Sequence, residues 1–213
     1  MRRFDQRRLE RVQELLTEDV EAGRLMGAAV QVSHEGQPEA PIVAGRRRLD
    51  AALSVEPDTI FLVASITKPI VAAAVVKLLE EGHLLLDDPV TRFVPEFGVN
   101  GKEDVVIRHL LTHTSGLPDQ IPENRDYREN KRPLSDFITR ICELPISFVP
   151  GTHISYQSCG IAMLGEICER VTEIDLATYL KTTIFDPLGL KDTALKLTDR
   201  STRESDVKIA GEG

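Results

Sequence analysis

The sequence predicts an α+β fold in which a helix and an antiparallel hairpin precede a mainly helical region. Residues 4–21 place apolar side chains at helical spacing, with charged residues on the other face. Residues 28–32 and 42–45 have the apolar composition of strands and flank a polar turn. From Ile66 onward the apolar spacing is almost entirely helical. The order of these patterns predicts one helix packed on a hairpin, followed by a helical region.

We expect this order to divide the chain into three regions. Residues 1–60 carry the first helix and the strands, residues 61–192 form the mainly helical domain, and residues 193–213 begin a return to the sheet. The sequence shows no internal repeat or low-complexity tract. The regions are therefore expected to be distinct parts of one fold rather than copies of a unit.

The helical region begins with an apolar, helix-favouring segment. Residues 70–80 repeat apolar side chains at three- and four-residue steps, and Gly82 follows the last predicted turn. Pro69 lacks the N–H that an interior turn needs, so it belongs within the first turn. These features predict a buried helix that starts near Ser65. Later patterns predict a short helical turn begun by Pro89, a polar loop over residues 119–131, and helices over residues 105–111, 134–143, 159–171 and 174–182.

Composition and charge exclude several classes of function. The 213 residues are 41% hydrophobic and 28% charged, and the net charge of -8 argues against nucleic acid as a partner. Acidic residues follow the basic N-terminus where a secretory signal would carry its apolar segment, and no run approaches the roughly 18 apolar residues of a membrane span. We therefore expect a soluble, cytoplasmic protein without a membrane partner. The sequence does not predict its oligomeric state.

The metal-binding residue types do not form a metal-site pattern. Cys142, Cys159 and Cys168 are an odd number and lack zinc-ligand spacing, so we expect reduced, mostly buried core residues. Asp87 and Asp88 could ligate a metal, but adjacent acids before a proline more often cap a helix, and we prefer capping. No metal site is therefore expected.

Ser65 and Lys68 form the first chemical pattern. A serine at a helix N-terminus most often serves as an N-cap, whose hydroxyl accepts a backbone N–H. Lys68 follows on the same helix face, so its side-chain nitrogen can return to the serine oxygen. A neutral lysine could take the proton of Ser65, and the helix N-terminus would add positive potential for an oxyanion. The motif alone is weak evidence, because roughly one match is expected by chance in a chain of this length.

Further motifs follow in order along the chain. They are His113-Thr114-Ser115-Gly116-Leu117, then Pro150-Gly151, then Tyr156-Gln157-Ser158 before a helix containing Leu164-Gly165-Glu166. With Ser65 and Lys68, this ordered set resembles the serine β-lactamase and penicillin-binding-protein superfamily, in particular its class C β-lactamase-like branch, which includes esterases and D-amino-acid peptidases. The resemblance runs from the first helix to about Asp192. It implies a β-lactamase/transpeptidase-like fold, with a helical domain and an antiparallel sheet flanked by helices.

The resemblance also implies a role for each motif residue. Ser65 would be the acylated nucleophile, Lys68 its proton acceptor or the group that tunes it, and Tyr156 the acid/base that protonates the leaving group and later activates water. A phenol has a pKa of about 10, so Tyr156 would need the positive charge of Lys68 nearby to act as a phenolate. The alternative for Tyr156 is an interfacial aromatic whose hydroxyl lies in water. Neither a metal nor an organic cofactor is implied.

Two departures from the family pattern change these expectations. Ser158 stands where the family commonly has asparagine. Ser158 could still hydrogen-bond Lys68 and bind substrate, but it lacks the side-chain amide of asparagine. This loss favours an ester or a different amide, rather than a β-lactam, as the substrate. No Lys- or His-[Thr/Ser]-Gly triplet follows it, because Lys181-Thr182-Thr183 lacks the glycine and lies in a helical pattern. The motif at His113 comes too early for that role and is interpreted as a structural loop. The chain is therefore expected to be the N-terminal part of a longer protein, with an incomplete sheet and one oxyanion donor missing.

Two functions remain open. The first is a serine hydrolase that acts through an acyl-enzyme on a small-molecule ester or amide, of β-lactamase-like, esterase or D-peptidase type. The second is a non-catalytic or inactive member of the same fold that acts as a binding or regulatory protein. Ser158 and the absent third motif favour the second function, whereas the joint presence of Ser65, Lys68 and Tyr156 favours the first. The sequence does not identify the acyl group.

Overall fold

The computed structural model describes residues 4–48 and 52–196 of the chain. The described residues fall into two compact units, and the boundary between them lies between Ala64 and Ser65. The second unit, Ser65–Lys196, therefore starts at the predicted nucleophile. The three-region division stays a prediction, and most of its last region, residues 197–213, lies outside the described residues.

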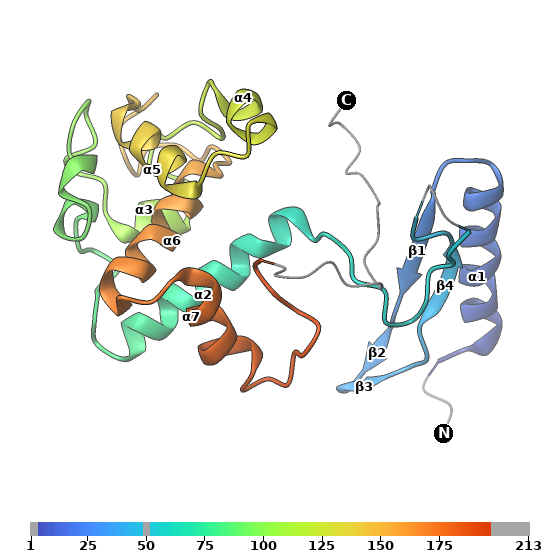
Figure 1. The fold of residues 1–213 in the computed structure, drawn as a ribbon. Helices are drawn as coiled ribbons and strands as arrows, with labels where there is room; N and C mark the ends of the chain where they lie inside the picture. Colours follow the sequence, from blue (N-terminus) through green and yellow to red (C-terminus); the bar gives the residue numbers. More distant parts are fainter. Residues whose placement is uncertain (1–3, 49–51, 197–213) are drawn as a thin grey trace. The chain divides into compact units, whose positions relative to one another are not determined.

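The first unit contains a helix packed on a strand (Figure 1). Helix α1, Gln6–Glu21, begins after Asp5, whose carboxylate accepts the N–H of Arg7 at 2.9 Å. The side chain of Gln13 donates to the carbonyl of Val43 at 3.2 Å. This contact joins α1 to strand β4, and the predicted amphipathic helix is confirmed.

The hairpin next to α1 has an outer and an inner part. Its outer strands β1, Gly27–Val30, and β4, Ile42–Gly45, pair antiparallel. The inner strands β2, Ser33–His34, and β3, Gln37–Pro38, continue the hairpin around a two-residue turn. Both turn residues have positive φ, 49° at Glu35 and 73° at Gly36, as a tight hairpin turn requires. The observed turn is shorter than the predicted turn over residues 34–38, because His34, Gln37 and Pro38 pair as strand residues.

The second unit is organised around two helices that pack against each other (Figure 1). They are α2, Thr67–Glu80, and α6, Cys159–Thr172. The buried residues of α2 repeat at helical steps, which confirms the predicted apolar face. The residues that are buried on the two helices are Val71, Ala74, Val75 and Leu78 of α2 and Cys159, Gly160, Met163, Leu164, Gly165, Ile167 and Cys168 of α6.

Shorter helices complete this unit around the same core. Three helices pack on α6, namely α3, Ile107–Leu111, α5, Leu134–Glu143, and α7, Leu176–Leu180. The predicted loop over 119–131 is wrong in part, because its centre forms helix α4, Asn124–Glu129. The last predicted helix changes from α-helical to π-helical hydrogen bonding at Lys181. The remaining elements are η1 Ala64–Ile66, η2 Val90–Arg92, η3 Pro95–Phe97, α3 Ile107–Leu111, α4 Asn124–Glu129, α7 Leu176–Leu180 and the π-helix η4 Lys181–Phe185.

The two adjacent aspartates before Pro89 do not cap a helix. The residue before the short helix η2 is Pro89, and no side chain caps this turn. Asp88 instead accepts the backbone N–H of Leu85 at 2.8 Å and pairs with Arg92. Asp87 pairs with Arg108 at 2.9 Å. The capping prediction is wrong because a preceding backbone N–H and two arginines bind these carboxylates.

A lysine lies in the core although no sequence pattern marks it. Lys102 has 0% of its surface exposed, and its ammonium donates to the carbonyl of Leu144, directly after α5. Asn100 donates to the neighbouring carbonyl of Glu143 at 2.8 Å. These side chains bind carbonyl groups that the helix end leaves without helical partners. Burial lowers the pKa of Lys102.

Within residues 4–48 and 52–196, no helix is both long enough and apolar enough to cross a membrane. The same residues contain no group of three or more histidine, cysteine, aspartate or glutamate side chains arranged to hold a metal ion. The cytoplasmic location expected from the sequence stays a prediction.

The three cysteines are buried and unpaired, as predicted, and we expect them to be unreactive in the folded protein. Burial raises the pKa of Cys142 to about 11 and those of Cys159 and Cys168 to about 12. Because the thiolate is the reactive form, iodoacetamide at pH 8 should leave all three unmodified in intact-mass spectra. The same treatment in urea is the control and should modify all three. Rapid alkylation of the folded protein would contradict this expectation.

Gly116 provides a test of the packing in the loop before α4. Its φ is 82°, and an added Cβ would lie 2.5 Å from the carbonyl oxygen of Phe148. We expect Gly116→Ala to lower the free energy of unfolding by about 3 kcal/mol, measured by urea denaturation. Gly82, with φ 78° and nothing within 4 Å of an added Cβ, is the matched control. Gly82→Ala should cost about 1 kcal/mol, and equal costs for both variants would exclude the predicted clash.

Candidate active site

Ser65 lies in the 3₁₀ turn η1, directly before helix α2. The preceding residue, Ala64, has φ 44°, a left-handed conformation that is uncommon for residues with a side chain. The residue at the N-cap of α2 is Ile66, and no side chain caps this helix. The N-cap alternative for Ser65 is therefore wrong, and its hydroxyl is available for other contacts.

The structure brings the three predicted catalytic residues together around one oxygen atom. Nζ of Lys68 donates to Oγ of Ser65 at 3.1 Å, from the next turn of the same helix. The hydroxyl of Tyr156, 91 residues further along the chain, donates to the same Oγ at 2.7 Å. Nζ of Lys68 also lies 4.6 Å from the centroid of the Tyr156 ring. The serine oxygen thus contacts both groups that could move its proton.

The charge of Lys68 changes the acidity of the phenol. The pKa of Tyr156 is lowered, first by the nearby ammonium of Lys68 and then by the hydrogen bond to Ser65, against a smaller opposing effect of burial. Tyr156 remains 50% exposed, so solvent and substrate can reach it. At a given pH, Tyr156 in this arrangement is therefore more readily deprotonated than an isolated tyrosine.

A buried glutamine holds the segment that carries Tyr156. Gln157 has no exposed surface, and its side-chain oxygen accepts the hydroxyl of Ser115 at 2.6 Å. Its side-chain nitrogen donates to the carbonyl of His109 at 3.4 Å. Because Gln157 points into the core, its two neighbours Tyr156 and Ser158 retain partly exposed side chains. The middle residue of the motif is therefore an anchor for the segment.

His113 also contacts this segment, a role that the sequence analysis missed. Its carbonyl accepts the N–H of Ser155 at 2.9 Å, and its ring lies 5.0 Å from the ring of Tyr156, tilted by 40°. The loop was interpreted as structural only. The sequence signal that points to this contact is the position of His113 at the start of one of the ordered motifs.

Ser158 binds a different partner from the one expected. Its hydroxyl donates to Oδ1 of Asp119 at 2.8 Å, and its N–H donates to the same oxygen at 2.9 Å. Among the hydrogen bonds of residues 4–48 and 52–196, none joins Ser158 to Lys68. The structure therefore does not bring Ser158 to Lys68, and its role in substrate binding stays a prediction. Asp119, which the sequence analysis assigned to a loop, positions Ser158.

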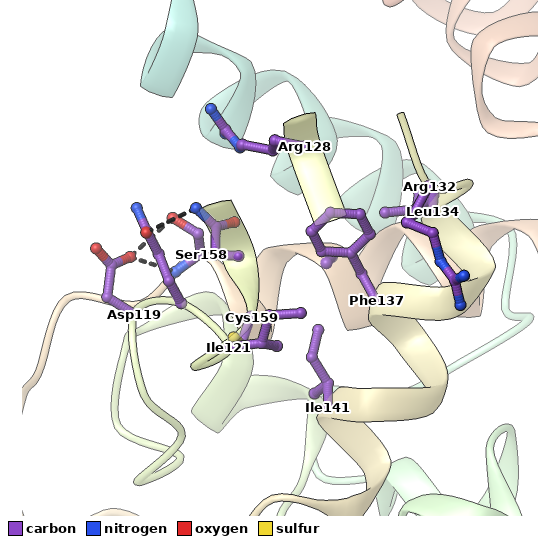
Figure 2. A pocket seen from close by; sticks show the side chains of 12 residues that line it. Asp119, Ile121, Arg128, Arg132, Leu134, Phe137, Ile141, Ser158 and Cys159 are labelled. Carbon is purple, nitrogen blue, oxygen red and sulfur yellow. Dashed lines mark hydrogen bonds between the residues drawn. The ribbon is translucent and has the colours of Figure 1, made fainter. Parts of the chain in front are cut away.

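A cavity of about 330 Å³ lies beside Ser158 and Asp119. Figure 2 shows these two residues joined by hydrogen bonds on one side and apolar side chains of α5 on the other. The wall is apolar towards α5 and polar towards the loop before α4. The lining residues are Asp119, Gln120, Ile121, Asn124, Arg128, Arg132, Leu134, Phe137, Ile141, Ser158, Cys159 and Ala162.

Comparison with known proteins gives one family match and several relatives. The model of the Beta-lactamase family matches residues 12–205. The chain is 38% identical over 184 residues to Esterase EstB of Burkholderia gladioli, covering 79% of this chain and 47% of that protein. It is 26% identical over 201 residues to Protein flp of Staphylococcus aureus (strain N315), covering 93% of this chain and 40% of that protein. The chain thus spans less than half the length of these curated relatives.

Solved structures resemble the chain at similar coverage. A penicillin-binding protein homologue from Pyrococcus abyssi, described as octameric, is 29% identical, with a TM-score of 0.76 over 86% of this chain and 43% of that one. EstCE1, described as a hydrolase with promiscuous acyltransferase activity, is 26% identical, with a TM-score of 0.75 over 85% of this chain and 51% of that one. The predicted β-lactamase/transpeptidase-like α+β fold is confirmed. The chain therefore belongs to the β-lactamase family, within the serine β-lactamase and penicillin-binding-protein superfamily that its motifs resemble.

Proposed function

We propose that this protein is a serine hydrolase that acts on a small-molecule ester or amide through an acyl-enzyme formed on Ser65. The observation that carries the proposal is the convergence of Lys68 and Tyr156 on the Ser65 oxygen, at 3.1 and 2.7 Å. A serine hydroxyl is a weak nucleophile until a neighbouring base removes its proton. Both candidate bases lie at hydrogen-bond distance from that hydroxyl.

In the acylation step, the phenolate of Tyr156 takes the proton of Ser65 while Oγ attacks the substrate carbonyl carbon. The tetrahedral intermediate collapses as the bond to the leaving group breaks, and Tyr156 returns the proton to the departing alcohol or amine. Lys68 stabilises the phenolate by its positive charge. The N-terminus of α2 lies next to Ser65 and adds positive potential where the oxyanion forms.

In the deacylation step, water replaces the leaving group. Tyr156 removes a proton from water, and the hydroxide attacks the acyl carbon. The bond from that carbon to Oγ of Ser65 breaks, and the proton returns to Ser65. One ester and one water are thus converted to one acid and one alcohol, with no metal or organic cofactor in the scheme.

Several observations support an ester rather than a β-lactam as the substrate. The hydroxyl of Ser158 binds Asp119 at 2.8 Å and offers no amide for a β-lactam side chain. The cavity beside Ser158 has an apolar wall suited to an uncharged substituent. A relative of 38% identity is named an esterase. We place this activity in the cytoplasm, as the sequence predicts.

A non-catalytic binding or regulatory protein is the second candidate. Ser158, which stands where the family commonly has an asparagine, favours it. In the structure, Lys181-Thr182-Thr183 lies in the π-helix η4 rather than on a strand. Acylation of Ser65 distinguishes the two candidates.

The first test is intact-mass spectrometry of the protein after incubation with a fluorophosphonate and, separately, with a penicillin. We expect one fluorophosphonate adduct, which Ser65→Ala abolishes because the attacking oxygen is gone. Tyr156→Phe should slow labelling by about 100-fold, since it removes the proposed acid/base. Labelling by penicillin as well would move the assignment from esterase to lactamase or peptidase.

Correct folding is the control for this test, measured by circular dichroism of each variant. A folded wild-type sample that forms no adduct would exclude the hydrolase proposal for this chain and favour the non-catalytic candidate. An adduct that persists in Ser65→Ala would show that another residue is the nucleophile.

The role of Lys68 makes a separate prediction about the acidity of Tyr156. The ammonium lowers the pKa of Tyr156, so replacing Lys68 by the neutral methionine should raise that pKa towards the ordinary value of about 10. The measurement is the tyrosinate absorbance against pH, after subtraction of the same titration of Tyr156→Phe. Lys77→Met, which removes a lysine of the same helix that pairs with Glu80 and Glu81, is the matched control. A Tyr156 pKa that does not rise in Lys68→Met would contradict the proposed role.

A further inference from the structure

We propose that His113 is a positioning residue for Tyr156. Its neutral imidazole holds the phenol against Ser65, and protonation of the ring releases the phenol. The expected effect of His113 on the reaction rate rests on the proposed hydrolase function. The expected effect on the position of Tyr156 does not, and it can be measured without turnover.

Two hydrogen bonds, one to the backbone carbonyl of His113 and one to its ring, join His113 to the residues on either side of Tyr156. The carbonyl of His113 accepts the N–H of Ser155 at 2.9 Å, and its Nδ1 accepts the N–H of Gln157 at 3.4 Å. The same histidine therefore binds the chain immediately before and immediately after the phenol. This arrangement restricts the backbone from which Tyr156 reaches Ser65.

The conformation of His113 allows both contacts at once. Its φ is 59°, in the left-handed region, so its carbonyl and its ring both reach the segment of Tyr156. Its ring also packs on the Tyr156 ring at 5.0 Å between centroids. The next residue, Thr114, is held as well, because its N–H donates to His109 at 2.9 Å and its carbonyl accepts from Gly151 at 2.8 Å.

The hydrogen bond at Nδ1 makes the arrangement depend on the charge of the ring. Nδ1 can accept the Gln157 N–H only while it carries no proton, so the proton of the neutral ring is on Nε2. Protonation would place an N–H opposite the Gln157 N–H and remove this bond. It would also place a second positive charge near Lys68. The first effect frees the ring from the Tyr156 segment, and the second disfavours its present position near Lys68.

The groups that face His113 favour its neutral form near neutral pH. Burial lowers the pKa of His113, and the positive charge of Lys68 on α2 lowers it further. The carboxylate of Asp119 opposes these effects, and Tyr156 is the third ionisable group in contact. With the pKa below the ordinary value of about 6.5, the ring is neutral at pH 7 and gains its proton only in more acidic solution.

The first measurement is an NMR titration of the full chain that follows histidine and tyrosine ring signals with pH. The variants His113→Asn and Tyr156→Phe assign the two signals. We expect the signals of Tyr156 and of the Gln157 amide to shift with the same midpoint as His113. Tyr156 signals that do not respond at the His113 midpoint would overturn the proposal.

The second measurement is the rate of fluorophosphonate labelling against pH. In the wild type, the labelling rate should decline in acid as the catalytic base is protonated. Protonation of His113 should lower the labelling rate by about a further tenfold. His113→Asn should label about tenfold more slowly near neutral pH, because it lacks the ring that packs on Tyr156. It should also lack this additional fall, because the asparagine amide gains no proton in this pH range. Asparagine is chosen because it tolerates positive φ and keeps an acceptor oxygen.

His153→Asn is the matched control, because its exposed ring packs on Phe148 at 5.4 Å rather than on Tyr156. It should label at the wild-type rate and keep the additional fall in acid. An additional fall that persists in His113→Asn would overturn the proposal. If no variant and no wild-type sample is labelled, the hydrolase proposal fails, while the NMR titration still decides whether His113 positions Tyr156.

Discussion

The packing of helix α2 against helix α6 is the constraint on which the candidate site depends. Ser65 and Lys68 lie at the start of α2, and Tyr156 lies just before α6. Because both helices bury one face in the same close-packed core, neither can slide without opening a cavity. The distance of 2.7 Å between two hydroxyl groups 91 residues apart is thus maintained by apolar residues that take no part in chemistry. The two helix N-termini also add positive potential, which favours an oxyanion and a phenolate.

Between the core and the phenol lies a set of buried polar contacts. Gln157 uses its side-chain oxygen and nitrogen and its backbone N–H, and each has a partner within Ser115, His109 or His113. A buried amide without partners would cost about 1–3 kcal/mol, so these bonds fix the orientation of Gln157. Tyr156 is thereby directed outward, towards Ser65. Lys102 is a second buried polar side chain of this unit with a hydrogen-bond partner, because its ammonium donates to the carbonyl of Leu144 after α5.

Periodic apolar segments were predicted well because burial and spacing are both encoded locally. The faces of α2, α5 and α6 lie inward as their three- and four-residue steps predict. Short elements were predicted less well. Helix α4 lies within a segment interpreted as a loop, since it buries no residue and therefore has no apolar stripe to reveal it. The aspartates before Pro89 were interpreted as caps, but their partners Arg92 and Arg108 are chosen by tertiary contacts.

The sequence by itself determined the mixture of helices and strands and the helix that carries Ser65 and Lys68, and its ordered motifs resemble a family whose pattern implies Tyr156 as their partner. These follow from patterns between near neighbours and from the order of motifs. Only the tertiary structure decided that Ser158 binds Asp119 and that His113 contacts Tyr156. Such pairings join segments far apart in the chain, and their strength depends on distance, burial and the direction of each donor. None of these quantities is encoded in the spacing of residues along a sequence.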